Sequence, residues 1–514
     1  MSPTLLFTVV FGYFLLLLAV AWYTSRNSNN DSFFIGNRNS NWVLVAFGMI
    51  GTSLSGVTFI SVPGTVGVGG FGYFQVVIGY LIGYFAVAFV LLPLYYRMNL
   101  TSIYTYLLNR FGFVSYKTGA LFFIISRTLG ATARLYLVIN VLQIFILDAM
   151  GVPFWMTTLA ILLMIILYTF KGGVKTIVFT DTLQTSFIII GLLVCLFYIK
   201  NQLHLNVTEV WNSFSQKHYS KLINTDYKSA GFFLKSLFGG AFITIAMTGL
   251  DQEMMQKNIS VHNLKDSQKN MISLSFLQAI VVLIFLFLGG LLYMYADSLG
   301  AQMIPSTVNA KAQLMLENKN IIGDNLFPEI VLQHLPPIIS IIFILGLISA
   351  LFPSADGALT ALTSSFCIDM LGLKRNQLWN EQKQKTIRKT VHLAFAAVFF
   401  LCVVVFKLID NKSIIDIILK LAGYTYGPLL GLFAFGILTK RQMKESYLIP
   451  IICLVSPAIC YFLSENAAKW FNGYQIGVEL LILNGLLTFM GLFMISKKTD
   501  WKETLQMKNI SSMR

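Results

Sequence analysis

The sequence predicts an all-α polytopic membrane protein with 13 transmembrane helices, from its composition and from its repeated apolar runs. Of its 514 residues, 56% are hydrophobic and only 11% are charged, whereas about 25% of residues are charged in a soluble domain. An apolar run of about 20 residues is long enough to cross a bilayer as a helix. Runs of this length favour a helical bundle over a barrel, whose strands are only about ten residues long. The runs are 5–23, 42–68, 71–96, 118–147, 154–170, 176–199, 231–249, 271–296, 336–368, 390–409, 413–439, 446–464 and 476–496.

The basic residues are distributed unequally between the two ends of these runs. Connections at one end hold 24 of the 37 Lys and Arg residues, those at the other end hold eight, and five lie within the runs. Basic residues gather on the cytoplasmic side of membrane proteins. We therefore expect a multi-pass protein of the cell membrane, with its N-terminus outside and its C-terminus in the cytoplasm. The net charge of +15 then reflects topology in the lipid bilayer, and no nucleic-acid partner is expected.

A carboxylate lies deep inside one apolar run, in the segment ALFPSADGALTALTSSF at residues 350–366. A charge at that depth is costly unless it is paired, so Asp356 marks a functional site by default. Ser354 and Thr360 add hydroxyl oxygens to the same run. Such oxygen-rich surroundings suit a hard cation better than a transition metal.

Two runs are unusually rich in glycine and hydroxyl residues. The second contains GMIGTSLSGVTFISVPGTVGVGG and the seventh contains GGAFITIAMTG. Each opens a set of five runs, 42–199 and 231–439. Interrupted helices at matching positions of two halves point to a midplane binding site in transporters built from inverted repeats. Alternatively, the glycines only allow helices to pack closely, which by itself accounts for Gly79 and Gly83.

Five segments between residues 30 and 440 carry a recognisable pattern: DSFFIGNRNSNW, LTSIYTYLLNRFG, KGGVKTIVFTDTLQ, TGLDQEMMQKNIS and FPSADGALTALTSSFCIDML. In order and spacing they resemble the sodium/solute symporter family of bacteria, whose members carry sugars, proline, pantothenate or sialic acid. The resemblance implies a LeuT-type five-plus-five inverted repeat with one leading and two trailing helices, located in the bacterial inner membrane and functional as a monomer. The implied parts are 1–41 (leading helix and first cytoplasmic loop), 42–199 (first repeat), 200–230 (external loop), 231–439 (second repeat) and 440–514 (two peripheral helices and a cytoplasmic tail).

The resemblance also implies a sodium ion, Na+, held between the runs at 42–68 and 336–368. One of its ligand positions departs from the family pattern, because Pro353 offers no hydroxyl group. Proline does remove a backbone N–H and thereby frees the carbonyl four residues earlier, at Ser349. Asp356 is placed to add negative charge. The implied ligand positions are Gly51, Leu54, Ala350, Pro353 and Ser354.

Asp181, in the segment VFTDTLQ, corresponds to an acid that some family members use for a second sodium ion. Its alternative role is that of a helix-entry acid that meets Lys175 or solvent. The hydroxyl groups of that second site correspond here to Asp356 and Gly357, so the resemblance leaves the number of ions open. Asp181 and Asp356 are the candidates for a second ion or for coupling.

Polar residues near the predicted helix break are candidates for solute binding. Ser53, Ser55 and Thr58 follow or overlap the break, and Gln75 begins the next run. The family's sialic acid carriers use polar residues at similar places. The alternative for each Ser or Thr is a hydrogen bond to the carbonyl four residues earlier in its own helix.

Arg127 and Arg134 are seven residues apart, so a helix places both on one face, about 10 Å from each other. A guanidinium group matches a carboxylate with two hydrogen bonds. One arginine is expected to hold an anionic solute, and the other to pair with Asp181 or Asp356 or to reach an interface; the sequence does not decide which. Phe242 and Tyr424 are candidate gates or stacking partners of a sugar, with ordinary packing as the alternative.

Taken together, these features predict a sodium-coupled symporter that imports a small polar organic solute by alternating access, with a sugar acid such as sialic acid favoured by the arginines. Proton coupling through Asp181 or Asp356, and a sodium-dependent channel or sensor on the same scaffold, are the alternatives. No catalytic residue is expected, because only His392 of the five histidines lies within a run.

Overall fold

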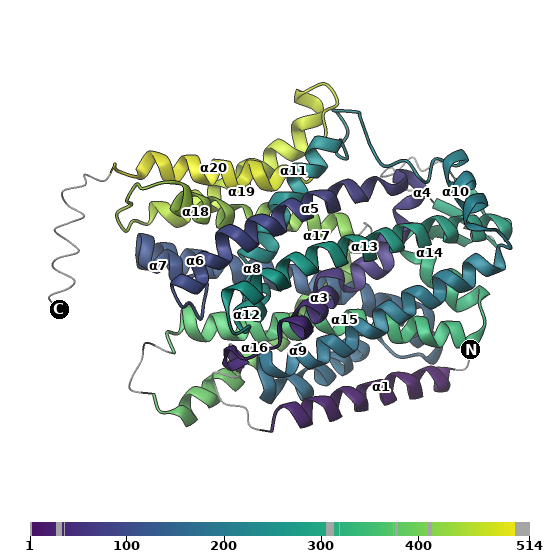
Figure 1. The fold of residues 1–514 in the computed structure, drawn as a ribbon, viewed down its shortest axis with the longest axis horizontal. Helices are drawn as coiled ribbons and strands as arrows, with labels where there is room; N and C mark the ends of the chain where they lie inside the picture. The colour runs from purple at the N-terminus through teal and green to yellow at the C-terminus, as the bar shows by residue number, and fades with distance from the viewer. Residues whose placement is uncertain are drawn as a thin grey trace.

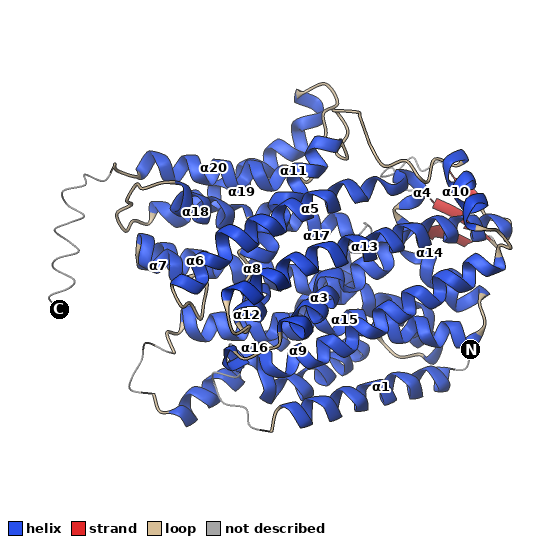
Figure 2. Ribbon diagram, viewed as in Figure 1, coloured by secondary structure: helices blue, strands red, loops and turns tan. Residues whose placement is uncertain are grey.

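The computed structural model shows a bundle of long helices that run along one common direction (Figure 1). A small three-stranded sheet sits at one end of the bundle (Figure 2). Helix α1 begins at that end, and the last helix, α20, finishes at the opposite end (Figure 1). The structure describes residues 3–26, 33–34, 36–304, 313–317, 319–373, 375, 379–409 and 414–498.

Many of the described helices are long and apolar enough to cross a membrane. Eight meet that criterion as single helices, two further pairs meet it when each bent pair is taken together, and three shorter apolar helices accompany them. The protein is therefore a multi-pass membrane protein. The first half contains α1 (Pro3–Thr24), α3 (Trp42–Gly64), α4 (Val66–Gly69), α5 (Phe74–Ala86), α6 (Leu92–Arg97), α7 (Thr105–Phe111), α8 (Phe113–Leu142), α9 (Phe154–Gln202) and α10 (Val207–Gln216).

The second half has the same character, and the predicted all-α class is confirmed apart from the small sheet. Its elements are α11 (Phe233–Thr244), α12 (Gln252–Ile259), α13 (Leu264–Ser298), β1 (Gln302–Ile304), β2 (Gln313–Leu316), β3 (Lys319–Ile322), α14 (Gly323–Glu329), α15 (Pro337–Ser365), α16 (Glu381–Ile409), α17 (Ile414–Thr425), α18 (Gly427–Leu438), α19 (Leu448–Trp470) and α20 (Leu480–Ile495).

Several helices are broken inside the bundle. In α3 the backbone of Ser55 is non-helical, with φ 44° and ψ 170°, which confirms the break expected in the second apolar run. Helix α9 combines two apolar runs around Gly173, whose φ is 55°. The helix that starts at Phe233 bends by 65° before α12, and α17 bends by 43° before α18.

The two long connections of the chain contain regular structure. The connection after α9 holds α10, whose N-cap Asn206 and Glu209 form a capping box. The connection after α13 holds the sheet instead, in the order β1-β2-β3. Its strands are antiparallel, with Gln302 opposite Met315 and Leu314 opposite Ile321. Short strands of this kind carry only a weak pattern, which a search for apolar runs does not detect.

The contact between α5 and α11 confirms the packing role expected of two glycines. A Cβ on Gly79 would overlap the Leu237 carbonyl oxygen, and one on Gly83 would overlap the Ala241 carbonyl oxygen. Across the interface, a Cβ on Gly240 would overlap the Val76 carbonyl oxygen. The two backbones therefore approach more closely than any larger residue would permit.

Helix α3 lies at the centre of the bundle, where it packs against α9, α13 and α15. Eighteen of its residues are buried, including the whole stretch from Gly48 to Leu54 except Ser53. A helix buried on all sides places any polar group it carries in contact with other helices rather than with lipid. The break in α3 is therefore surrounded by protein.

We expect Gly79→Ala to lower the free energy of unfolding by about 1–3 kcal/mol, because the added methyl group forces α5 and α11 apart. The measurement is thermal unfolding of the purified protein in detergent. The matched control is Gly130→Ala on α8, where a Cβ would have nothing within 4 Å. That change should leave stability equal or raise it by up to about 1 kcal/mol, as alanine favours helix. Equal stability of both variants would contradict the close approach.

Candidate functional site

The break in α3 lies directly beside α15. After Ser55, the chain passes Gly56, whose missing side chain lets the backbone contact Val138 of α8. A Cβ at Gly56 would lie 3.9 Å from the carbonyl oxygen of Ala350 on α15. A positive φ at a residue other than glycine costs energy and is typical of functional sites. The two segments expected to hold sodium, on α3 and α15, are thus brought together.

The Ala350 carbonyl oxygen of α15 lies beside this break. The Ser354 hydroxyl donates to the Ala350 carbonyl at 3.3 Å, and Pro353 contributes no N–H to the helix. By contrast, the Ser349 hydroxyl donates to Tyr13 of α1 at 2.8 Å and so faces another neighbour. Ser354 and Ala350 therefore present two adjacent oxygens, as the sodium-site prediction requires.

The α3 candidates lie around the same break. Gly51 is buried against α9, where its N–H donates to Thr185 Oγ1 at 3.1 Å, and Leu54 is buried as well. The Ser53 hydroxyl oxygen is buried, with the Tyr84 hydroxyl of α5 as its polar neighbour.

Helix α12 was not foreseen, because its sequence was assigned to a cytoplasmic loop after residue 249. The structure continues the span through a bend to Asp251, which caps α12 by accepting from the backbone N–H of Glu253 at 2.9 Å and of Met254 at 3.3 Å. Every residue of α12 is buried. An eight-residue helix with charged side chains is therefore enclosed in the bundle.

Arg127 is held by two acids of this segment. Its guanidinium forms a very short ion pair with Glu253 and lies 3.8 Å from Asp251. The Tyr426 hydroxyl also donates a hydrogen bond to Asp251 Oδ2, at 2.7 Å. The sequence predicts Asp181 or Asp356 as the partner of one arginine. Arg127 pairs instead with Glu253 and Asp251, because the bend before α12 brings these two carboxylates closer.

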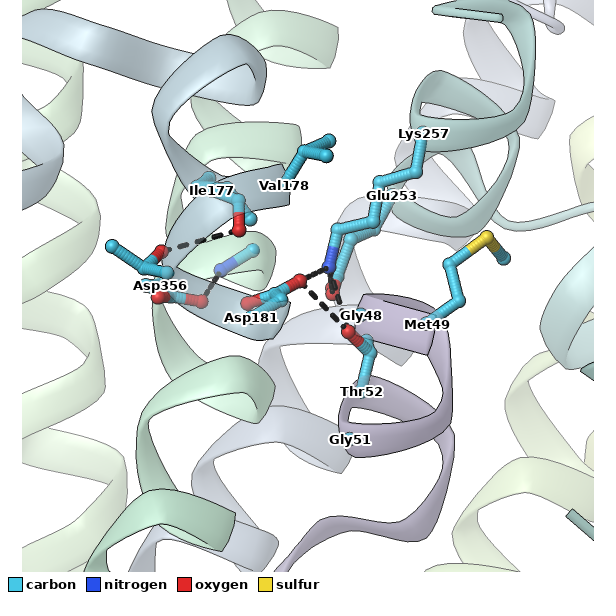
Figure 3. A network of polar contacts seen from close by, with 12 residues as sticks. Gly48, Met49, Gly51, Thr52, Ile177, Val178, Asp181, Glu253, Lys257 and Asp356 are labelled. Carbon is cyan, nitrogen blue, oxygen red and sulfur yellow. Dashed lines mark hydrogen bonds and ion pairs between the residues drawn. The ribbon is translucent and has the colours of Figure 1, made fainter. Parts of the chain in front are cut away.

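Asp181 is paired with a lysine of α12 rather than with Lys175 or solvent (Figure 3). The Lys257 ammonium lies 2.7 Å from Asp181 Oδ2 and 2.8 Å from the Thr52 hydroxyl of α3. It also lies 3.5 Å from Glu253 Oε1. Thr52 in turn donates to Asp181 at 3.1 Å. Lys257 thereby joins α12 to α3 and α9.

Asp356 is fully buried and faces α9. Its Oδ2 accepts from the Tyr168 hydroxyl at 2.6 Å, and its Oδ1 accepts from the backbone N–H of Gly357 at 2.5 Å. Both oxygens are thus supplied with donors from the protein. We call the following residues the buried charge cluster: Arg127, Asp181, Asp251, Glu253, Lys257 and Asp356.

Arg134 differs from Arg127 in its surroundings. It is half-buried and lies within electrostatic reach of Tyr73 and Tyr80 on the α5 side. Among the residues that the structure describes, no acid lies within ion-pair distance of Arg134. Its guanidinium is therefore available for a carboxylate that the chain itself does not supply.

Gln75 connects α5 to the segment that precedes α11. Its side-chain amide donates to Gly72 at 2.9 Å and to Gly231 at 3.4 Å, and its oxygen accepts from the backbone of Asn224 at 3.1 Å. All its contacts in the structure are with the chain, so Gln75 holds the 224–231 segment over the end of α5. Its expected role as a solute contact gains no support from these bonds.

The remaining candidates divide between the site and the periphery. Thr58 is buried beyond the break in α3, and Phe242 is packed at the edge of the core on α11. The Tyr424 hydroxyl instead lies 2.6 Å from Ser464 on α19. The neighbouring tyrosine, Tyr426, is the one that contacts Asp251. The contact of Tyr424 with Ser464 does not support its predicted role as a gate.

Comparison with known proteins agrees with this geometry. The family model described as sodium:solute symporter family matches residues 33–452. The sodium/sialic acid symporter SiaT of Proteus mirabilis is 24% identical over 494 residues, which is 94% of this chain and 94% of that protein. The sodium/sialic acid symporter NanT of Aliivibrio fischeri is 23% identical over 94% of this chain and 93% of its own.

A solved structure shares the whole fold. It is a substrate-bound, outward-open state of a Na+-coupled sialic acid symporter, and it superposes with a TM-score of 0.77 at 19% identity, covering 96% of this chain and 99% of its own. The family match over residues 33–452 confirms the predicted recognition, and the protein is a transporter rather than an enzyme. With broken helices around a polar centre and a family model that covers most of its length, this chain belongs to the sodium:solute symporter family.

Proposed function

We propose that this protein imports an organic acid, such as sialic acid, together with sodium by alternating access. The observation that carries the choice of solute is the contrast between the two arginines of α8. Glu253 and Asp251 already neutralise Arg127, whereas Arg134 lies near tyrosines with no acid of the described chain in pairing range. A buried guanidinium is stabilised by a carboxylate, and two relatives are named for a sugar acid.

The proposed sodium ligands are the backbone oxygens of Gly51, Leu54 and Ala350 and the hydroxyl of Ser354. Support comes from the break at Ser55 and from its proximity to Ala350. Pro353 supplies no ligand of its own, and the carbonyl of Ser349 that it frees is the substitute. Oxygen ligands without nitrogen or sulfur suit a hard cation.

We propose Ser53 and Thr58 of α3 as solute contacts, together with Arg134. Support comes from the positions of Ser53 and Thr58, which lie on either side of the break at Ser55. Ser55 acts through its backbone, since it forms the break. Phe242 remains a predicted gate on α11.

The proposal includes a topology in the membrane. We infer 13 spans, with 42–199 and 231–439 as inverted repeats, 1–41 as the leading part and 440–514 as the trailing part. The long helices, bent pairs and short apolar helices support this count. An external N-terminus and a cytoplasmic C-terminus follow from the basic residues, and the opposite positions of α1's start and α20's end (Figure 1) are consistent with it. The monomer is taken as the working unit.

In this orientation the buried charge cluster closes the cytoplasmic end. Helix α12 is tied to α8 by Arg127 and to α3 and α9 by Lys257. Separating these pairs without water would leave charges unpaired in the bundle. Passage to the inward-open state therefore requires α12 to move away and its charges to be hydrated, which releases sodium and solute to the cytoplasm.

The direct test is uptake of labelled sialic acid by proteoliposomes that contain the purified protein. We expect accumulation above the external concentration with an inward sodium gradient and none when potassium replaces sodium. Uptake that follows a pH gradient instead would favour proton coupling. Equilibration without accumulation would favour a channel.

We expect Ser354→Ala to raise the sodium concentration for half-maximal uptake about tenfold, equivalent to ~1.4 kcal/mol, because one ligand of the ion is lost. The matched control is Ser340→Ala on the same helix, whose hydroxyl donates to the Val331 carbonyl at 2.8 Å and which should change this concentration less than about twofold. The measurement is the sodium dependence of initial uptake rates. An unchanged sodium dependence in Ser354→Ala would contradict the site.

We expect Arg134→Gln to weaken sialic acid binding about 100-fold, or ~2.8 kcal/mol, because the carboxylate loses a charged partner. The measurement is the thermal stabilisation of the purified protein by sialic acid. Stabilisation by sodium alone should persist in the variant, which shows that it is folded. Solute stabilisation equal to that of the wild type would refute the role of Arg134.

A further inference from the structure

The ammonium group of Lys257 has surroundings of the kind that a small cation requires. Three oxygens face it: Asp181 Oδ2 at 2.7 Å, the Thr52 hydroxyl at 2.8 Å and Glu253 Oε1 at 3.5 Å. They come from three different helices, α9, α3 and α12 (Figure 3). The side chain of Lys257 is 3% exposed. A positive charge is thus placed at the acid that was the candidate ligand of a second ion.

Two features of the chain bring the lysine to this place. The bend before Asp251 directs α12 into the bundle, and Glu253 and Lys257 are four residues apart, so they lie on one face of that helix. On α15, Gly357 provides the necessary space. A Cβ at Gly357 would overlap Glu253 Oε1 and lie 3.2 Å from Lys257 Nζ. Any larger residue at position 357 would displace the pair.

The neighbouring acid of α15 is already held by two donors of the protein. Both oxygens of Asp356 accept hydrogen bonds from the protein, one from Tyr168 and one from the Gly357 backbone. At Asp181, a sodium ion would have to share the carboxylate with an ammonium group in contact with it. Two like charges at that separation in a site of low dielectric repel strongly.

We propose that Lys257 is a tethered cation that takes the place of a second sodium ion at Asp181, so that this transporter binds and carries one sodium ion per cycle. Lys257 is thus a positioning residue that sets ion stoichiometry, and Gly357 is the residue that admits it. This inference rests on the proposed sodium coupling at Ser354 and concerns only the number of ions.

Removal of the ammonium group should uncover a second site. Asp181 would then offer both oxygens, of which Oδ1 already has no hydrogen-bond partner in the described part of the chain. Thr52 and Glu253 would complete an oxygen shell. The neutral variant Lys257→Gln adds a further oxygen, whereas Lys257→Arg retains the charge.

The experiment is equilibrium binding of radioactive sodium to the purified full chain in detergent at pH 8, with the number of ions per chain as the readout. We expect one ion for the wild type and for Lys257→Arg, and two for Lys257→Gln. In parallel, the Hill coefficient for sodium activation of uptake should rise from about 1 toward 2 in Lys257→Gln. Stabilisation by sodium in a thermal-shift assay shows that each variant is folded.

Asp181→Asn keeps the inference testable if Lys257→Gln does not fold. We expect this variant still to bind one ion, because Asp181 is occupied by Lys257 and does not hold sodium. Two ions in the wild type, or a wild-type count that falls when Asp181 is replaced, would overturn the inference. So would a single ion in folded Lys257→Gln.

The binding experiment distinguishes an error in the proposed sodium site from an error in the role of Lys257. A wild type that binds no sodium would refute both. If Ser354→Ala weakens the single bound ion while Lys257→Gln still binds one, the sodium site is upheld and the tethered-cation inference is overturned.

Discussion

The ion pair between Lys257 and Asp181 is the contact on which the arrangement of the central helices depends. It joins three helices that are distant in the sequence, and Thr52 adds a hydrogen bond to both partners. Because neither charge has access to bulk water, each is stabilised by the other, and Glu253 adds a second negative charge 3.5 Å from Lys257. Thr52 lies one turn before the break at Ser55, so the helix proposed to offer oxygens to sodium also carries the contact with Lys257 of α12.

The sequence was sufficient to predict those features of the fold that depend on local composition. Apolar runs located the helices, and the glycines of the second run predicted a break, which the structure places at Ser55. Helix α12 escaped prediction because an average over about 20 residues cannot detect an eight-residue helix whose five polar side chains are buried. A local signal existed: Asp251 is a favourable N-cap, and Glu253 and Lys257 have the i, i+4 spacing of a helix.

The pairing partners of the charged site residues were harder to predict than the residues themselves. Arg127, Asp181 and Asp356 were identified as charges that need compensation, and all are buried. Their pairing depends on how helices far apart in the chain approach one another, which hydropathy does not encode. The same limit explains Gln75, whose three hydrogen bonds go to backbone groups of Gly72, Asn224 and Gly231. Contacts with backbone leave no pattern of side chains in the sequence.

The proposed role of Lys257 bears on how the protein responds to voltage. Lys257 is part of the chain, so with one sodium ion per cycle the only charges carried across the membrane would be those of that ion and of the solute. A monoanionic sugar acid and one sodium ion together carry no net charge. Such a cycle is electrically silent, and the membrane potential, worth about 2.3 kcal/mol per charge at 100 mV, adds nothing to its driving force. The difference in sodium concentration alone would then limit how far the solute is concentrated.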